Sequence, residues 1–161
     1  MNFYRMNKDA VAPRRATSGS ACYDLHACIN EENFKKINHP LSNQQCRGFI
    51  FLSPGQRLAI PTGIILDIPE GHVVKVFARS GLSYKNGISL ANCVGIIDHD
   101  YREELFVLLQ NNSSKLYKIN HGDRIAQMLL EKVLNYELLE THERPAILSS
   151  RSGGMGSTGN D

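Results

Sequence analysis

The sequence lacks the features that mark several common classes of protein. None of its apolar runs approaches the ~18 residues of a transmembrane helix, and Met1 to Asp24 has no apolar centre like that of a secretory signal peptide. The net charge over 161 residues is only +2, which argues against binding to nucleic acid or to an acidic membrane surface. We therefore expect a cytoplasmic protein that binds neither.

Cysteine pairs of the kind that hold zinc are also missing. The four cysteines are irregularly spaced and form no Cys-x-x-Cys pair. Cys22, His26 and Cys28 could supply metal ligands, but a second pair that would complete a zinc site is absent from the sequence. Reduced structural thiols are the favoured interpretation.

Helical periodicity is scarce, whereas short β-prone runs recur between breaks of Pro, Gly and Asn. These runs are residues 58–60, 63–68, 73–78, 105–110, 116–119 and 125–134. Short strands at regular spacing are typical of a β-sandwich or a jelly-roll barrel. The composition, 42% hydrophobic and 21% charged, is that of a globular protein, and the length suits one domain. We predict an all-β class.

The predicted domain organisation has two parts. A single jelly-roll-like domain covers residues 1–148, and a flexible, Gly-rich C-terminal arm covers residues 149–161. Residues 31–47 are polar and poor in strand formers, which predicts a surface insertion within the domain.

The stretch from Asn92 to Arg102 carries the strongest chemical signal. Four apolar or small residues run straight into acids and a tyrosine, which is typical of a buried strand that delivers polar groups to the rim of a sheet. Gly95 has no side chain, so another molecule can lie against the backbone there. Asp98 follows a bulky apolar pair, which predicts a partly desolvated carboxylate able to act as a base. An ordinary strand followed by an Asp-rich turn explains this window equally well.

Two other segments offer groups that bind anions. Ser80 is predicted as the N-cap of one helical turn, Gly81 leaves its amide open, and Arg79 adds a cation beside them. A plain turn between strands is the alternative for this segment. Near the C-terminus, Arg151 precedes a run of glycines and hydroxyl residues that could wrap a phosphate-bearing ligand. Composition alone favours a disordered tail there.

Taken together, these segments resemble the trimeric deoxyuridine triphosphatases (dUTPases). The five motifs of that family occur in order, at residues 20–25, 79–82, 92–104, 122–127 and 151–159. The resemblance implies a jelly-roll homotrimer with active sites at the subunit interfaces. It also implies hydrolysis of dUTP to dUMP and pyrophosphate with Mg²⁺, which keeps uracil out of DNA and supplies dUMP for thymidylate synthesis.

The same resemblance assigns roles to individual residues. It implies that Asp98 is the base that activates water for attack on the α-phosphorus, and that Tyr101 packs under the deoxyribose and excludes a 2′-hydroxyl. It also implies that Asp24 lies near the metal through water. The implied substrate-binding residues are Arg79, Ser80, Gly81, Asn92, Gly95, Ile97, Tyr101, Gln127, Arg151, Met155, Gly156 and Ser157.

The chain departs from the usual family pattern at three positions. Cys22 and Glu103 stand where the family commonly has glycine, and Met155 stands where an aromatic residue usually caps the uracil. The spacing from Arg151 to Met155 is one residue shorter than the common form, which leaves the register of Arg151 open.

Two other functions fit parts of the sequence. A dCTP deaminase has the same fold and binds a similar ligand, but the third motif here has the dUTPase form. A regulatory protein that uses nucleotide as a switch is the second alternative, with the polar insertion at residues 31–47 as its contact surface.

Overall fold

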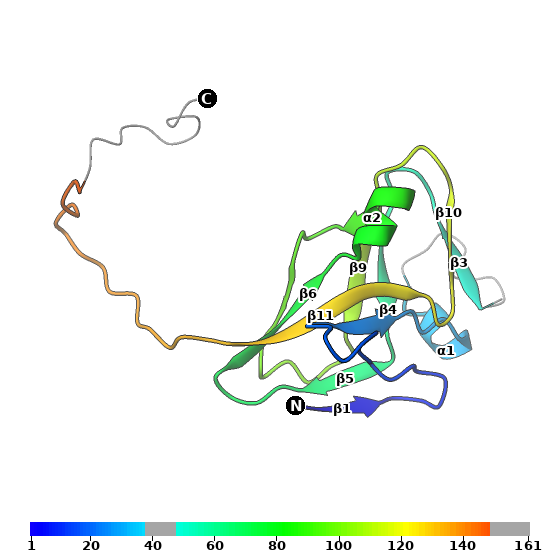
Figure 1. Ribbon diagram of the computed structural model, residues 1–161, viewed down its shortest axis with the longest axis horizontal. Helices are drawn as coiled ribbons and strands as arrows, with labels where there is room; N and C mark the ends of the chain where they lie inside the picture. The colour runs from blue at the N-terminus through cyan, green and yellow to red at the C-terminus, as the bar shows by residue number, and fades with distance from the viewer. Residues whose placement is uncertain (38–47, 149–161) are drawn as a thin grey trace.

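A computed structural model of the chain describes residues 1–37 and 48–148. Within them, eleven strands and two short helices alternate along the chain (Figure 1). The helices are α1 (Glu31–Phe34) and α2 (Ser80–Asn86). The strands are β1 (Asn2–Arg5), β2 (Tyr23–His26), β3 (Phe49–Leu52), β4 (Arg57–Pro61), β5 (Ile64–Asp67), β6 (His72–Phe77), β7 (Ile88–Leu90), β8 (Gly95–Ile97), β9 (Phe106–Asn111), β10 (Tyr117–Asn120) and β11 (Arg124–Lys132). The predicted all-β class is confirmed.

Every strand pair is antiparallel. The larger sheet has the order β2-β11-β6-β8, and a second sheet has the order β4-β9-β7. Two-stranded ribbons of β1 with β5 and of β3 with β10 complete a jelly-roll-like arrangement. All six predicted β-prone runs correspond to strands, namely β4, β5, β6, β9, β10 and β11. No helix in the described part of the chain is long and apolar enough to cross a membrane.

One hydrophobic cluster takes buried side chains from both larger sheets and from both ribbons. Leu25 and Val74 come from the four-stranded sheet, and Ile60 and Leu109 come from the three-stranded sheet. The alternating burial along β9, where Val107 and Leu109 point inward, is the period-2 pattern of a strand with one face on the core. The core therefore holds the sheets at fixed positions, and the sheet edges and loops are left to carry the site.

The prediction of a polar surface insertion at residues 31–47 is wrong for its first part. Asn30 caps α1, because its side-chain oxygen accepts a hydrogen bond from the amide of Asn33 at 2.9 Å. Asn33, Phe34 and Ile37 are buried. The three-residue spacing of Phe34 and Ile37 puts both on one face, which packs on the core. Residues 38–47 lie outside the described residues.

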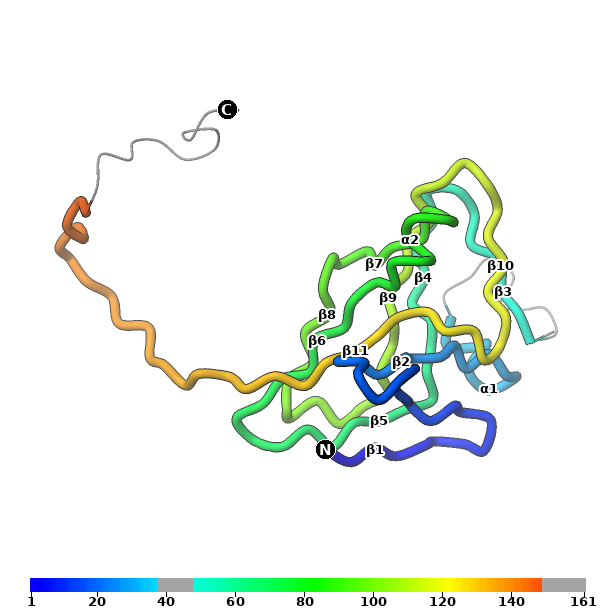
Figure 2. Tube along the Cα trace, in the orientation of Figure 1, coloured from blue at the N-terminus to red at the C-terminus, as the bar shows by residue number. Residues whose placement is uncertain are grey.

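After β11 the chain leaves the sheets. Residues 133–148 are exposed and form neither helix nor strand. Figures 1 and 2 show this segment, coloured orange, running away from the body of the protein. It carries several large apolar side chains, and Leu138 is 88% exposed. The predicted arm at residues 149–161 lies beyond the described part of the chain.

Candidate active site

Strand β8 lies at the edge of the four-stranded sheet, beside β6 (Figure 2). Gly95 is buried, but Ile96 is 54% exposed because its side chain points to the opposite face of the sheet. The predicted strand is therefore confirmed, but the prediction that it is buried is wrong for Val94 and Ile96. Asp98 follows β8 directly and is exposed, so the predicted desolvation of its carboxylate is absent within one chain.

A cavity of about 280 Å³ opens beside β8. Five of the predicted site residues line it, and these are Asn92, Gly95, Ile97, Asp98 and Tyr101. A Cβ atom added at Gly95 would lie 3.2 Å from Cβ of Val76 and 3.6 Å from Nδ2 of Asn92. The missing side chain therefore keeps this wall of the cavity open, as predicted from the sequence.

The loop that follows Asp98 is fixed by several hydrogen bonds. The Tyr101 amide donates to the carbonyl of Asp98 at 3.2 Å, and the Tyr101 hydroxyl donates to the carbonyl of Glu104 at 2.8 Å. Arg102 binds the carboxylate of Asp67 at 2.9 Å, which ties the loop to β5. Burial raises the pKa of Tyr101, and two nearby carboxylates add to the effect, so the hydroxyl stays protonated and keeps its donor role.

A second group of charged side chains gathers around Asp24 on β2. Its carboxylate lies 3.4 Å from Nε of Arg79 and 3.2 Å from Nη1 of Arg124. Arg79 also donates to the carbonyl of Arg124 at 3.1 Å. Gln127 pairs in register with Asp24, and its amide donates to the carbonyl of Ala78 at 3.4 Å. The structure thus brings Asp24, Arg79 and Gln127 together, and it adds Arg124, where the sequence predicted only a turn.

His26 belongs to the same group and is buried. Its Nδ1 atom has no hydrogen-bond partner among the described residues. Burial lowers the pKa of His26; Asp24 opposes this shift, and nearby arginines reinforce it. The imidazole is therefore neutral near neutral pH. The two-residue spacing from Asp24, which puts both side chains on one face of β2, was the available sequence signal.

Helix α2 begins at Ser80, so the predicted N-cap role of Ser80 is wrong. Arg79 occupies the cap position in an extended conformation, with no capping hydrogen bond from its side chain. An arginine side chain carries only donors and cannot accept a bond from the helix amides, and the Arg79 guanidinium instead lies beside Asp24. Ser80 and Gly81 are exposed, and a Cβ atom added at Gly81 would meet nothing within 4 Å. The first turn of α2 is therefore open to a ligand.

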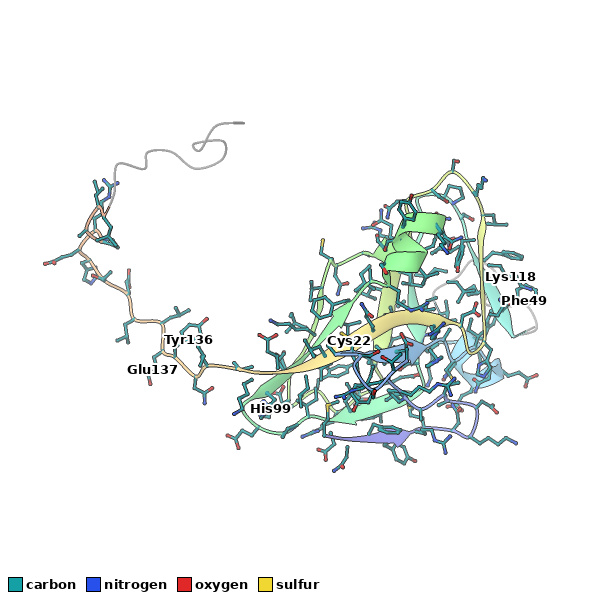
Figure 3. All side chains as sticks on the ribbon, viewed as in Figure 1. Cys22, Phe49, His99, Lys118, Tyr136 and Glu137 are labelled. Carbon is teal, nitrogen blue, oxygen red and sulfur yellow. The ribbon has the colours of Figure 1, made fainter. Side chains whose placement is uncertain are left out.

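The two groups lie at opposite ends of β6. Ile97 pairs with Val74 near the start of β6, whereas Arg79 follows its other end. The five residues of extended chain from Val74 to Arg79 span about 16 Å at ~3.3 Å per residue. Asp98 follows Ile97, the partner of Val74, and so lies about one residue further from Arg79. Figure 3 shows His99, the residue after Asp98, at the end of the sheet away from α2. Asp98 and Arg79 of one chain cannot act on the same phosphate group.

Several predicted features remain to be placed. Cys22 is partly buried just before β2, and Glu103 is exposed. Glu103 does not need the backbone of glycine, because Cys93 is the one non-glycine residue with a positive φ in residues 1–37 and 48–148. The predicted ligands of the arm, Arg151, Met155, Gly156 and Ser157, lie outside the described residues.

The model of the dUTPase family matches residues 45–159 of the chain. This protein belongs to the dUTPase family. It is 40% identical over 147 residues to the deoxyuridine 5′-triphosphate nucleotidohydrolase of Finegoldia magna, a match that covers 91% of this chain and 90% of that protein. It is 36% identical over 155 residues to the protein of the same name from Hydrogenobaculum sp., with 96% and 94% covered.

Solved dUTPases share the fold. A single-residue mutant of the dUTPase of Staphylococcus bacteriophage 80alpha, with dUpNHpp, has a TM-score of 0.76 at 22% identity, and the match covers 98% of this chain and 97% of that one. A dUTPase variant from phage phi11 of S. aureus, described with a structural Mg(II) ion, has a TM-score of 0.70 at 22% identity, with 88% and 96% covered. Both comparisons support the jelly-roll assignment for this member of the family.

Proposed function

We propose that this protein hydrolyses dUTP to dUMP and pyrophosphate. The observation that carries the proposal is the cavity at β8, where an amide, an open glycine wall, a tyrosine ring and an acid meet. Membership of the dUTPase family supports the same substrate. The arginine group around Asp24 supplies the positive charge that a triphosphate requires.

Uracil would lie against Gly95, with its polar edge facing β8. The side chain of Asn92 offers both a donor and an acceptor, and an edge strand leaves backbone N–H and C=O groups available on its outer side. These groups can match the alternating acceptors and donor of uracil. The exocyclic amine of cytosine would place a donor where uracil has an acceptor, which disfavours dCTP. The Tyr101 ring would lie under the deoxyribose.

Asp98 would act as the general base. It takes a proton from water as the water oxygen forms a bond to the α-phosphorus, and the bond from that phosphorus to the bridging oxygen of the β-phosphate breaks, so pyrophosphate leaves. The exposed position of Asp98 at the rim of the cavity leaves room for that water. Arg79, Arg124 and Gln127 would neutralise and orient the phosphates, with Ser80 and Gly81 contributing the open first turn of α2.

Mg²⁺ fits this site through water and through the substrate. The ion commonly keeps several waters and binds one or two carboxylates together with phosphate oxygens. Asp24 is already held between two guanidinium groups, so a water-mediated contact suits it better than direct coordination. Among the described residues, no group of three His, Cys, Asp or Glu side chains could hold the ion without substrate. When bound, Mg²⁺ would neutralise phosphate charge.

The separation of Asp98 from Arg79 supports a homotrimer in which neighbouring chains complete each site. A base must lie within hydrogen-bond reach of the water that it activates, and one chain does not bring its own base to its own arginines. The exposed apolar side chains of residues 133–148, such as Leu134 and Leu138, also suit an assembly in which they are covered. The arm at residues 149–161 would then close over a neighbouring site.

The test is product release from four nucleotides. Purified protein with Mg²⁺ would be given dUTP, dCTP, dTTP or UTP, and pyrophosphate and ammonia would both be measured. We expect pyrophosphate from dUTP far faster than from the other three, and no ammonia. Ammonia from dCTP without pyrophosphate would instead assign the protein to the deaminases of this fold.

A further inference from the structure

Glu104, just after the Tyr101 loop, is a buried carboxylate with three hydrogen-bond donors. The residue is 5% exposed. Its Oε1 atom accepts from the amide of Gly63 at 2.8 Å and from Nδ2 of Asn33 at 3.4 Å. Its Oε2 atom accepts from Nζ of Lys36 at 2.9 Å. A buried carboxylate is tolerated only when it is paired and hydrogen-bonded in this way, so these contacts strongly constrain where Glu104 lies.

The same residue holds the tyrosine of the cavity. The carbonyl of Glu104 accepts the Tyr101 hydroxyl at 2.8 Å, and Tyr101 lines the cavity beside β8. A continuous series of contacts therefore runs from Lys36, beside α1, through Glu104 to the Tyr101 ring. The Asp98 carboxylate and the arginine group around Asp24 take no part in it.

The partners of the two Glu104 carboxylate oxygens differ in rigidity. Gly63 has a positive φ of 67°, and a Cβ atom there would lie 2.7 Å from Cβ of Ala10, so the backbone on that side is tightly packed. Lys36 has a side chain that is 32% exposed, and it also contacts Glu32 at 3.8 Å. Lys36 is therefore the partner whose removal changes the electrostatics of Glu104 with the least disturbance of the core.

We propose that Lys36 and Glu104 are a positioning pair that fixes the Tyr101 ring and so sets the preference of the site for deoxyribose over ribose. The proposal rests on the proposed function, in which the ring packs under the sugar. Without Lys36, the carboxylate loses the cation that compensates its burial, and the segment from Tyr101 to Glu104 loosens. A loosened ring leaves room for the 2′-hydroxyl of UTP.

The first test compares dUTP and UTP in the full-length protein. In Lys36→Met we expect the ratio of kcat/KM for dUTP to that for UTP to fall about tenfold, with kcat for dUTP nearly unchanged. Lys35→Met removes the same charge from the exposed neighbouring position and should leave the ratio unchanged. Lys36→Arg should preserve it. An unchanged ratio in a folded and active Lys36→Met protein overturns the proposal.

The second test asks whether the effect passes through the Tyr101 hydroxyl. Tyr101→Phe keeps the ring and removes the bond to the Glu104 carbonyl. Adding Lys36→Met to Tyr101→Phe should therefore lower the ratio no further, whereas additive effects would show that the pair acts by another route. Glu104→Gln keeps an oxygen for the Gly63 amide but loses the charge, and should lower the ratio as Lys36→Met does. This variant decides the question if Lys36→Met does not fold.

The two proposals fail in distinguishable ways. A wild-type protein that releases no pyrophosphate from dUTP contradicts the proposed function. A wild-type protein that hydrolyses dUTP selectively, with selectivity that survives both Lys36→Met and Glu104→Gln, contradicts the positioning pair alone.

Discussion

One methyl group at Gly95 should weaken dUTP binding more than it weakens the fold. Gly95 is buried on β8, and its φ is not positive, so alanine adds no backbone strain. The added Cβ atom would lie 3.2 Å from Cβ of Val76, which requires one strand to move by a few tenths of an ångström. Overpacking of this kind costs ~1–3 kcal/mol in general. We expect a value near 1 kcal/mol here, because β8 is an edge strand and can shift.

The effect on binding should be larger. The same methyl group would lie 3.6 Å from Nδ2 of Asn92 and would occupy the wall against which uracil is proposed to lie. Loss of one well-formed pair of hydrogen bonds to a base is worth ~1–3 kcal/mol. At 1.36 kcal/mol per factor of ten, KM for dUTP should rise about 5-fold to about 150-fold.

The assay is steady-state pyrophosphate release, with the free energy of unfolding measured on the same protein. Gly19→Ala is the matched control, since a Cβ atom there meets nothing within 4 Å and Gly19 is exposed. It should change neither quantity. An unchanged KM in a Gly95→Ala protein that has lost stability would show that the base does not lie against Gly95.

Three further variants test the remaining parts of the account. Asp98→Asn should keep the affinity for dUpNHpp, measured by calorimetry, while turnover falls ~10²–10⁴-fold; turnover within about tenfold of wild type would move the base to another residue, with Asp100 the next candidate. Tyr101→Ala should relax discrimination between dUTP and UTP more than it weakens dUTP binding, and an unchanged ratio of kcat/KM would remove Tyr101 from sugar selection. The pKa of His26 is lowered from 6.5 in the folded chain, so as the pH falls the imidazole of the unfolded chain takes up a proton before that of the folded chain. The free energy of unfolding should therefore fall as the pH drops below 6.5. Urea titrations at several pH values should show a smaller fall in His26→Gln than in wild type.

Most strands with a face on the core could be predicted from sequence, but β2, β3 and β7 also have buried residues and were not among the predicted runs. Runs such as residues 58–60 and 105–110 alternate or concentrate apolar side chains, and they became β4 and β9. Strand β1 was not predicted because all four of its residues are exposed, so its sequence does not alternate between apolar and polar residues as a half-buried strand does. The buried face near α1 had a signal in the spacing of Phe34 and Ile37, but the surrounding polar residues obscured it.

For the site, residue types were predictable and their distribution in space was not. The open wall at Gly95 follows from the local sequence, whereas the approach of Arg79 to Asp24 joins segments far apart in the chain and was not predicted. The exposure of Asp98 depends on how the loop after β8 lies against the rest of the fold, which the local sequence does not determine. Glu104 was missed for a similar reason, since its donors come from segments more than forty residues away in the chain, at separations of 41 for Gly63 and 68 for Lys36.

The central claim is that each site combines Asp98 of one chain with Arg79 of another, and co-assembly of two inactive variants tests it most directly. Asp98→Asn and Arg79→Ala chains would be co-expressed in equal amounts with different tags, and doubly tagged trimers would be compared with trimers of each variant alone. Random assembly restores both residues in about a quarter of the sites, so the unselected mixture should recover about a quarter of wild-type turnover of dUTP. Turnover of the mixed trimers no higher than that of the two separate variants would contradict a site built between chains.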